Sequence, residues 1–261
     1  MTRQIRYTLA DPTGNITLLI ESAIPAAQQP AAAASVMRAE PTAEQAGFLS
    51  DEAGCDIALR MAGGEFCANA AMSAAAYHAR RAGMTDGQVS VRVSGAPAPI
   101  AVKIALQADG LWCAAVGMPQ PRSVETVRFP DGQTFPIVFF PGIAHVIAEC
   151  AMPHAQAEQC ARQWCAALQT DALGIMFLDL SAGTLKPLVY VPAADTIFWE
   201  SACGSGTSAV GAYLAKKSGK PVNISLRQPG GSLTVFASPE GGLRLGGTVR
   251  LHSPKTLQAE T

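Results

Sequence analysis

Short runs in which apolar and polar residues alternate recur along the chain and predict β-strands. Residues 89–93, Val-Ser-Val-Arg-Val, and residues 222–226, Val-Asn-Ile-Ser-Leu, have the two-residue period of a half-buried strand. Further strands are expected on either side of two glycine-containing turns, at residues 109–110 and 240–242. The pattern therefore predicts that both halves of the chain are mostly β-sheet.

A helical segment interrupts the strands once in each half, and the two segments match one another. When Cys67 is aligned with Cys203, identical or similar residues coincide as far as a glycine at the end of each segment. The matched positions are Tyr77 and Tyr213, Arg80-Arg81 and Lys216-Lys217, and Gly83 and Gly219. We expect each copy to begin as a helix at or just after its cysteine and to end at its glycine. The self-similarity predicts two copies of one α+β unit, each with a central helix and with their border near residues 118–119.

An Ala- and Pro-rich stretch at residues 24–41 has the composition of a linker. The residues that follow it, 42–49, have helical spacing. We therefore expect a loop that contains a short helix in this part of the chain, rather than disorder.

The composition favours a protein that acts on a small molecule. Of the 261 residues, 49% are hydrophobic and 15% are charged, which is enough apolar material for substantial cores. The formal net charge of −1 at pH 7 provides no electrostatic footprint for nucleic acid or an acidic membrane surface. No stretch approaches the roughly 18 apolar residues that span a bilayer, and no signal peptide is evident. We expect a cytoplasmic protein without nucleic-acid or membrane partners, and the sequence leaves a homodimer open.

The cysteines and histidines do not have the spacing of a metal site. The seven cysteines include no Cys-x-x-Cys pair, and the four histidines are scattered. Five of the cysteines are expected to be small buried hydrophobic residues, namely Cys55, Cys113, Cys150, Cys160 and Cys165. No metal is therefore expected.

Cys67 and Cys203 are at positions where a thiol is suited to proton transfer. A side chain at a helix N-terminus faces unpaired backbone N–H groups and the positive end of the helix dipole. Both favour the thiolate, so we expect the pKa of each thiol to fall from about 8.5 toward neutrality. A duplicated fold could retain both cysteines for packing alone, but exposed thiols at helix starts are poor packing choices.

Small residues follow each cysteine and leave room for a substrate carboxylate. Ala68-Asn69-Ala70 and Gly204-Ser205-Gly206 allow close approach to the backbone N–H groups, and the Asn69 amide is a further donor. With the two halves facing each other, one thiol would lie on each side of the substrate α-carbon. One thiolate would remove the α-proton while the opposite thiol returns a proton to the other face, and the N–H groups would stabilise the developing charge. The arrangement predicts racemisation of an amino acid without a cofactor.

The paired cysteine segments resemble the diaminopimelate epimerase superfamily, which also includes proline racemases and phenazine-pathway isomerases. Residues 63–70, Gly-Gly-Glu-Phe-Cys-Ala-Asn-Ala, look like the first catalytic segment of that family, and residues 202–207, Ala-Cys-Gly-Ser-Gly-Thr, look like the second. The resemblance implies an α+β fold of two pseudo-symmetric units, each a curved, mostly antiparallel sheet or barrel around a central helix. It also implies an active site in the cleft between the units. The last strand would return to the first unit, so that the units are 1–118 with 247–261, and 119–246.

The resemblance also implies which residues contact the substrate. Asn15 and Gln45 are at positions where the epimerases have a substrate-contacting asparagine and glutamine, and Glu200 closely precedes the second cysteine. The expected catalytic residues are Cys67 and Cys203, and the expected substrate-binding residues are Asn15, Gln45, Ala68, Asn69, Glu200, Gly204 and Ser205.

The substrate is expected to be an amino acid with a single zwitterionic group. Diaminopimelate epimerases bind a second ammonium and carboxylate, but Ile143 replaces a turn asparagine in residues 142–145 (Gly-Ile-Ala-His) and no arginine precedes Cys203. Residues 44–48 and 63–67 look closer to the histidine racemases of staphylopine-type metallophore pathways, which makes histidine the favoured substrate. The alternatives are a proline or hydroxyproline racemase, a diaminopimelate epimerase-like enzyme, and a carboxylate-binding protein without activity.

Overall fold

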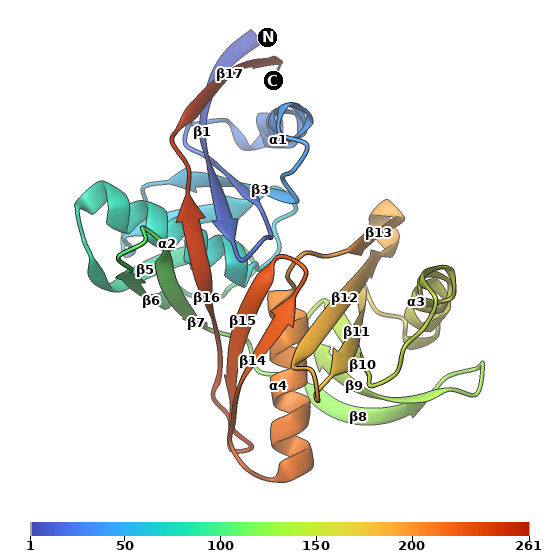
Figure 1. Ribbon diagram of the computed structural model, residues 1–261. Helices are drawn as coiled ribbons and strands as arrows, with labels where there is room; N and C mark the ends of the chain where they lie inside the picture. The colour runs from blue at the N-terminus through green and yellow to red at the C-terminus, as the bar shows by residue number, and fades with distance from the viewer. Residues whose placement is uncertain (1, 261) are drawn as a thin grey trace. The chain divides into compact units, whose positions relative to one another are not determined.

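The chain divides into two compact units (Figure 1). A computed structural model describes residues 2–260. The first unit consists of Met1–Gly117 and Gly246–Thr261, and the second of Met118–Leu245. Both borders lie one residue earlier in the chain than the sequence predicts.

The first unit contains a ring of eight strands. Its strands are β1 (Thr2–Pro12), β2 (Thr17–Ile20), β3 (Gln45–Ser50), β4 (Ile57–Met61), β5 (Asp86–Val93), β6 (Ile100–Leu106), β7 (Trp112–Gly117), β16 (Leu243–Leu251, whose first residues belong to the second unit) and β17 (Lys255–Glu260). Each strand from β1 to β7 pairs with the next, β7 pairs with β16, and β16 pairs with β1 through residues 249–251. β17 lengthens the ring by pairing with the first half of β1. The C-terminal segment thus completes the sheet that the N-terminal strand begins.

Helix α2 (Ala68–Ala82) is the central helix of the first unit. It contacts β1, β2, β4, β5, β6 and β7, and nearly all of its residues from Ala68 to Ala79 are buried. A helix enclosed by strands has no polar face, which explains its run of alanines. It ends at Gly83, whose φ of 68° is the left-handed conformation of a helix C-cap. The predicted start and end of this helix are confirmed.

The second unit has the same plan. Its strands are β8 (Ser123–Arg128), β9 (Thr134–Phe140), β10 (Ile143–Ala148), β11 (Leu173–Asp179), β12 (Thr184–Val191), β13 (Thr196–Trp199), β14 (Val222–Gln228) and β15 (Gly231–Ala237). Its helices are α3 (His154–Leu168), the short η2 (Pro192–Ala194) and α4 (Gly204–Ser218). α4 packs on β14 and β15 and also contacts β8 to β11. It ends at Gly219 with φ 65°, as predicted.

The two units repeat one order of strands and helices. In the first, α1 (Gln29–Ala39) connects the parallel pair β2 and β3, and α2 connects the parallel pair β4 and β5. In the second, α3 connects the parallel pair β10 and β11, and α4 lies between the parallel strands β12 and β14. The predicted α+β fold is confirmed.

The prediction for residues 24–49 is partly wrong. The Ala- and Pro-rich stretch itself forms η1 (Ala26–Gln28) and α1, and residues 45–50 form strand β3. Pro30 is in the first turn of α1, where its missing N–H costs no hydrogen bond, and alanines follow it. Ala46 and Phe48 on β3 join Ala32, Ala33 and Val36 of α1 in one core cluster.

Candidate active site

Cys67 is the N-cap of α2. Its backbone is extended, with φ −130° and ψ 113°, and its sulfur accepts a hydrogen bond from the Ala70 N–H at 3.4 Å. The thiol donates to Gln45 Oε1 at 3.2 Å. The sulfur thus takes the place of the oxygen that usually caps a helix at this position.

The side chain of Asn15 connects the polar groups around Cys67. Its Oδ1 accepts hydrogen bonds from Gln45 Nε2 at 2.7 Å and from Asn69 Nδ2 at 3.2 Å. Its Nδ2 donates to the Glu44 carboxylate. These hydrogen bonds join the three amides and the thiol in one network at the start of α2. Asn15, at the centre of the network, is only 7% exposed. The structure therefore brings together the residues predicted for the first unit.

A strained turn holds Asn15 in place. Thr13, which precedes Gly14, has φ 59°, a conformation that β-branched residues rarely adopt. Its Oγ1 accepts from the Thr248 N–H and donates to the Thr248 carbonyl, both at 3.2 Å. Strain of this kind persists where the surrounding structure fixes the backbone, and it is concentrated at functional sites.

Cys203 is the corresponding N-cap of α4. Its φ is −105° and its ψ is 107°, and its sulfur accepts from the Gly206 N–H at 3.3 Å. The Cys203 N–H donates to Gln228 Oε1 at 2.8 Å, and Gln228 Nε2 donates to Thr207 Oγ1 at 2.7 Å. A buried glutamine on β14 therefore fixes the backbone at the start of α4.

The pKa of the Cys203 thiol is raised, whereas its position at a helix start predicts that it is lowered. Burial raises the pKa of the Cys203 thiol well above its usual value, and the charge and hydrogen bond of Glu200 raise it further. Hydrogen bonds from Ser205 and the Gly206 N–H act in the other direction. Loss of water around the thiolate outweighs the helix start, because this side chain is only 4% exposed.

A buried histidine contacts the first turn of α4. His145 on β10 is fully buried, and its Nε2 is 3.0 Å from Ser205 Oγ. Ser205 Oγ is in turn 3.6 Å from the Cys203 sulfur. Burial lowers the pKa of His145 to about 3, so its imidazole is neutral at physiological pH.

The structure groups the predicted residues into two sets, one in each unit. Asn15, Gln45, Cys67, Ala68 and Asn69 form the set of the first unit, and Glu200, Cys203, Gly204 and Ser205 form that of the second. Sequence reasoning missed Glu44, His145 and Gln228 as members of these sets. Glu44 adjoins Gln45 and could have been found from it, whereas nothing in the sequence connects Gln228 with Cys203.

The remaining cysteines differ from expectation in part. Cys160 and Cys165 are buried as predicted, but Cys113 and Cys150 are exposed and Cys55 is partly exposed. Within residues 2–260, no group of three or more His, Cys, Asp and Glu side chains is arranged to hold a metal ion. In the same part of the chain, no helix is both long and apolar enough to cross a membrane.

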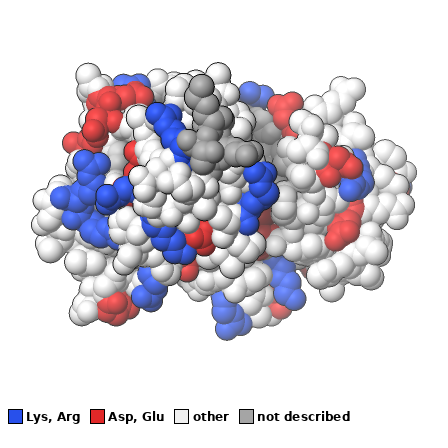
Figure 2. Space-filling model, turned by 90° about the horizontal axis from the view of Figure 1, so that it is seen from above, with Lys and Arg blue, Asp and Glu red and all other residues white. Residues whose placement is uncertain are grey.

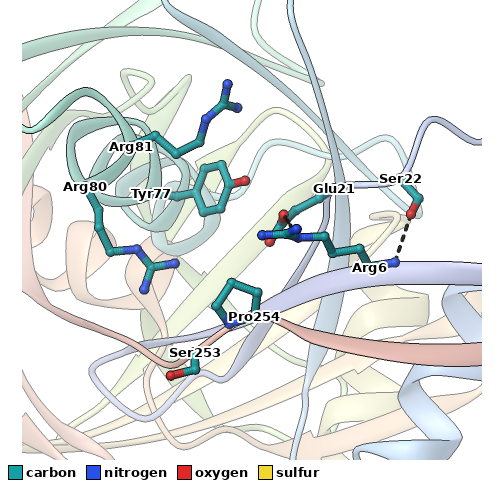
Figure 3. A pocket seen from close by; sticks show the side chains of 8 residues that line it. All are labelled: Arg6, Glu21, Ser22, Tyr77, Arg80, Arg81, Ser253 and Pro254. Atoms are coloured by element: carbon teal, nitrogen blue, oxygen red, sulfur yellow. Dashed lines mark hydrogen bonds and ion pairs between the residues drawn. The ribbon is translucent and has the colours of Figure 1, made fainter.

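A cavity of about 720 Å³ opens at the last turn of α2, at the other end of the helix from Cys67 (Figure 3). Tyr77 lies within it, with the guanidinium groups of Arg80 and Arg81 at 5.9 and 5.7 Å from its ring centroid. Burial and the nearby Glu21 carboxylate raise the pKa of Tyr77. The cavity is lined by Arg6, Glu21, Ser22, Tyr77, Arg80, Arg81, Ser253 and Pro254.

The second unit has a counterpart to this cluster of charged side chains. Tyr213 donates to Glu149 at 3.1 Å, and the Lys217 ammonium lies 5.2 Å from the Tyr213 ring centroid. Each unit thus has such a cluster on its own central helix. We therefore assign the clusters to the packing of each helix within its unit and not to the thiol sites. Figure 2 shows basic and acidic side chains mixed over one face of the molecule, in keeping with the formal net charge of −1.

Comparison with known proteins places the chain in a family. A model of the histidine racemase CntK N-terminal domain matches residues 4–251. The chain belongs to the histidine racemase family. A histidine racemase of Staphylococcus aureus is 29% identical over 257 residues, which cover 90% of this chain and 89% of that protein. A histidine racemase of Fusobacterium nucleatum is 30% identical over 215 residues, which cover 79% of this chain and 80% of that protein.

The fold is shared with solved structures of more distant proteins. A predicted epimerase from Pseudomonas aeruginosa has a TM-score of 0.72 at 17% identity, covering 97% of this chain and 99% of that one. The predictions of an isomerase and of an amino-acid racemase are confirmed by the family match.

Proposed function

We propose that this racemase interconverts L- and D-histidine by a two-thiol mechanism, with Cys67 and Cys203 on opposite faces of the α-carbon. The observation that carries the proposal is the duplicated N-cap. In each unit, a cysteine sulfur accepts a hydrogen bond from a backbone N–H in the first turn of the central helix. The family match supports histidine as the substrate.

In the proposed mechanism, each helix start supplies one thiol and a set of backbone N–H groups. One thiolate removes the α-proton, and the other thiol delivers a proton to the opposite face, so that the carbanion is short-lived. The free N–H groups at Ala68 and at Gly204-Ser205 would receive the substrate carboxylate, where charge accumulates as the proton leaves. The amides of Asn15, Gln45 and Asn69, together with Glu200, would orient the amino acid.

The raised pKa of Cys203 has two opposing effects on this chemistry. The α-proton of an amino acid is very weakly acidic, so the base that removes it must itself be strong. A thiolate whose conjugate thiol has a raised pKa is a stronger base than an exposed one. Burial at Cys203 therefore reduces the fraction of thiolate but increases the reactivity of each thiolate toward the C–H bond.

The proposal is tested with L-histidine in D₂O, without added cofactor or metal. Two thiols, one on each face, predict that early D-histidine carries deuterium from the solvent while unreacted L-histidine keeps its original hydrogen. A single base would return original hydrogen to the product and introduce deuterium into the starting enantiomer. Chiral chromatography followed by mass spectrometry measures both, and retention of the original hydrogen in early product would overturn the two-thiol mechanism.

Substrate choice is tested in the same assay with a panel of L-amino acids. Histidine is expected to have the highest kcat/KM. A higher value for proline or hydroxyproline would reject histidine as the substrate and leave the mechanism intact. No racemisation of any member of the panel would favour a binding protein.

A further inference from the structure

The two units differ at one pair of facing residues beside the proposed catalytic thiols. In the first unit, Thr17 of β2 is paired with Gln45 of β3, and the Gln45 amide extends to Cys67. In the second, the corresponding parallel strands pair His145 with Gly174. Gly174 has no side chain, and a Cβ there would collide with the His145 imidazole. The imidazole thus occupies the space that the glutamine side chain takes in the first unit.

The hydrogen bonds of His145 indicate which nitrogen carries the proton. Its Nε2 is 3.0 Å from Ser205 Oγ, whereas its buried Nδ1 has no hydrogen-bond partner among the described residues. A neutral imidazole has one N–H, and a buried N–H without a partner is rare in proteins. The proton therefore belongs on Nε2, which donates to the Ser205 oxygen. The serine hydroxyl is then left to donate to the Cys203 sulfur, 3.6 Å away.

We propose that His145 is a positioning residue that directs the Ser205 hydroxyl toward the Cys203 sulfur and so stabilises the thiolate of Cys203. The catalytic role of this contact rests on the proposed function, in which Cys203 exchanges a proton with the substrate. It also gives the Ser205 side chain a role different from substrate contact, because its hydroxyl lies between the imidazole and the thiol.

The charged and titratable groups around Cys203 explain why this donor is needed. Glu200, just ahead of α4, forms a hydrogen bond with the thiol and favours its protonated form, as does burial. His145 behind Ser205 is neutral, so it adds a donor without adding charge. Ser205 and the Gly206 N–H are the donors that oppose Glu200.

The same comparison gives the two thiols different neighbours. Cys67 donates to an acceptor, Gln45 Oε1, whereas Cys203 lies 3.6 Å from the Ser205 hydroxyl. The exchange of Gln45 and Thr17 for Gly174 and His145 thus places a donor beside Cys203 where Cys67 has an acceptor.

The test measures the thiolate fraction at Cys203 without requiring turnover. The full-length protein is treated with iodoacetamide at neutral pH, and modification of Cys203 is followed by mass spectrometry relative to the exposed Cys113. Only the thiolate reacts, so the rate is proportional to its fraction. In Ser205→Ala and in His145→Leu, Cys203 is expected to be modified about tenfold more slowly. Each variant loses the hydrogen bond from the Ser205 hydroxyl to the charged sulfur.

Two variants separate the proposed role from packing. His145→Gln places an amide N–H near the position of Nε2 and should restore the rate to within about threefold of the parent. Ser208→Ala removes another buried hydroxyl from α4, one that donates to the Gly204 carbonyl and not to the thiol, and should leave the rate unchanged. Should His145→Leu fail to fold, Ser205→Ala carries the test alone.

An unchanged or faster reaction of Cys203 in Ser205→Ala would overturn the inference. A slowdown of equal size in Ser208→Ala would also overturn it, since the effect would then belong to helix packing. Racemisation of histidine, measured in the same proteins, should also decrease. Slower modification with undiminished racemisation would confirm the role of His145 and reject the proposed use of Cys203 as a base.

Discussion

A buried sulfur atom at the start of a helix is subject to two opposing effects. The N–H groups of the first turn stabilise the thiolate, whereas loss of water destabilises it. At Cys203 the loss of water prevails, and the pKa of the thiol is raised although Gly206 N–H points at the sulfur. The position of a cysteine on a helix therefore does not determine its protonation state until its exposure is known.

Replacement of either proposed catalytic thiol by a hydroxyl tests the proposed mechanism directly. Cys67→Ser and Cys203→Ser are each expected to reduce racemisation of histidine by about a thousandfold, because a serine hydroxyl is far too weak an acid to supply the base. The rate is measured by chiral chromatography. Cys113→Ser, at an exposed position on β7, is the matched control and should retain full activity. More than about a tenth of the parent rate in Cys67→Ser or Cys203→Ser would contradict the proposed roles of these cysteines.

The two thiols could be found from the sequence because the chain repeats itself around them. Their helix-start position is encoded locally, by the small residues that follow each cysteine. The contact of His145 with Ser205 could not be found in this way, because it joins residues sixty positions apart and depends on the missing side chain of Gly174. The pKa of Cys203 depends likewise on burial by distant segments.

At the scale of the elements, α4 approaches its sheet more closely than alanines would allow. Gly211 faces Val235 of β15, and a Cβ at Gly211 would lie 2.5 Å from Val235 Cγ2. Neither atom could remain in place at that distance. The glycine therefore sets the separation of the helix from β15, and with it the position of the helix start that carries Cys203.

Gly211→Ala is expected to lower the free energy of unfolding by about 1–3 kcal/mol through overpacking. Chemical denaturation measures the change. In a double-mutant cycle, Val235→Ala should relieve part of the loss, because the two side chains compete for the same space. Gly117→Ala has no atom within 4 Å of the added carbon and should change stability by no more than about 0.5 kcal/mol. Additive effects at positions 211 and 235 would reject the explanation.

The elements that the sequence predicts well are those whose pattern has one clear period or is repeated in the other half of the chain. The alternating runs at 89–93 and 222–226 lie within β5 and β14, and both central helices begin and end as expected. Residues 42–49 were assigned wrongly because a short apolar pattern fits a helix or a strand equally well. Packing against α1 decides between them, since Ala46 and Phe48 share a core with Val36.

At the scale of the molecule, Glu40 joins the two ends of the chain. Its carboxylate accepts hydrogen bonds from Tyr7 of β1 at 2.8 Å and from Lys255 of β17 at 2.7 Å. The hydrogen bond from Lys255 is the main reason that the pKa of Glu40 is lowered. Burial, together with the hydrogen bond to Glu40, raises the pKa of Tyr7 to about 12.

Glu40→Gln should therefore make stability less dependent on pH. A carboxyl whose pKa is lowered by folding stabilises the protein above its unfolded pKa of about 4.3, and this contribution is lost as the pH falls through the folded pKa. The variant is expected to be less stable than the parent by about 1 kcal/mol at neutral pH, with the difference disappearing at acidic pH. Chemical denaturation at several pH values measures it, with the exposed Glu125→Gln as control. An equal difference at all pH values would show that the charge of Glu40 is not responsible.

The ring of the first unit has a consequence for the order in which the protein folds as it is synthesised. β1 is made first, yet the strands that pair with its second edge, β16 and β17, are made last. β16 pairs with both β1 and β7, and every strand from β8 to β15 leaves the ribosome before it. Most chains fold their N-terminal domain first during synthesis. Here the first unit is the one that must wait, with two strand edges open to wrong partners, until β16 and β17 have been made.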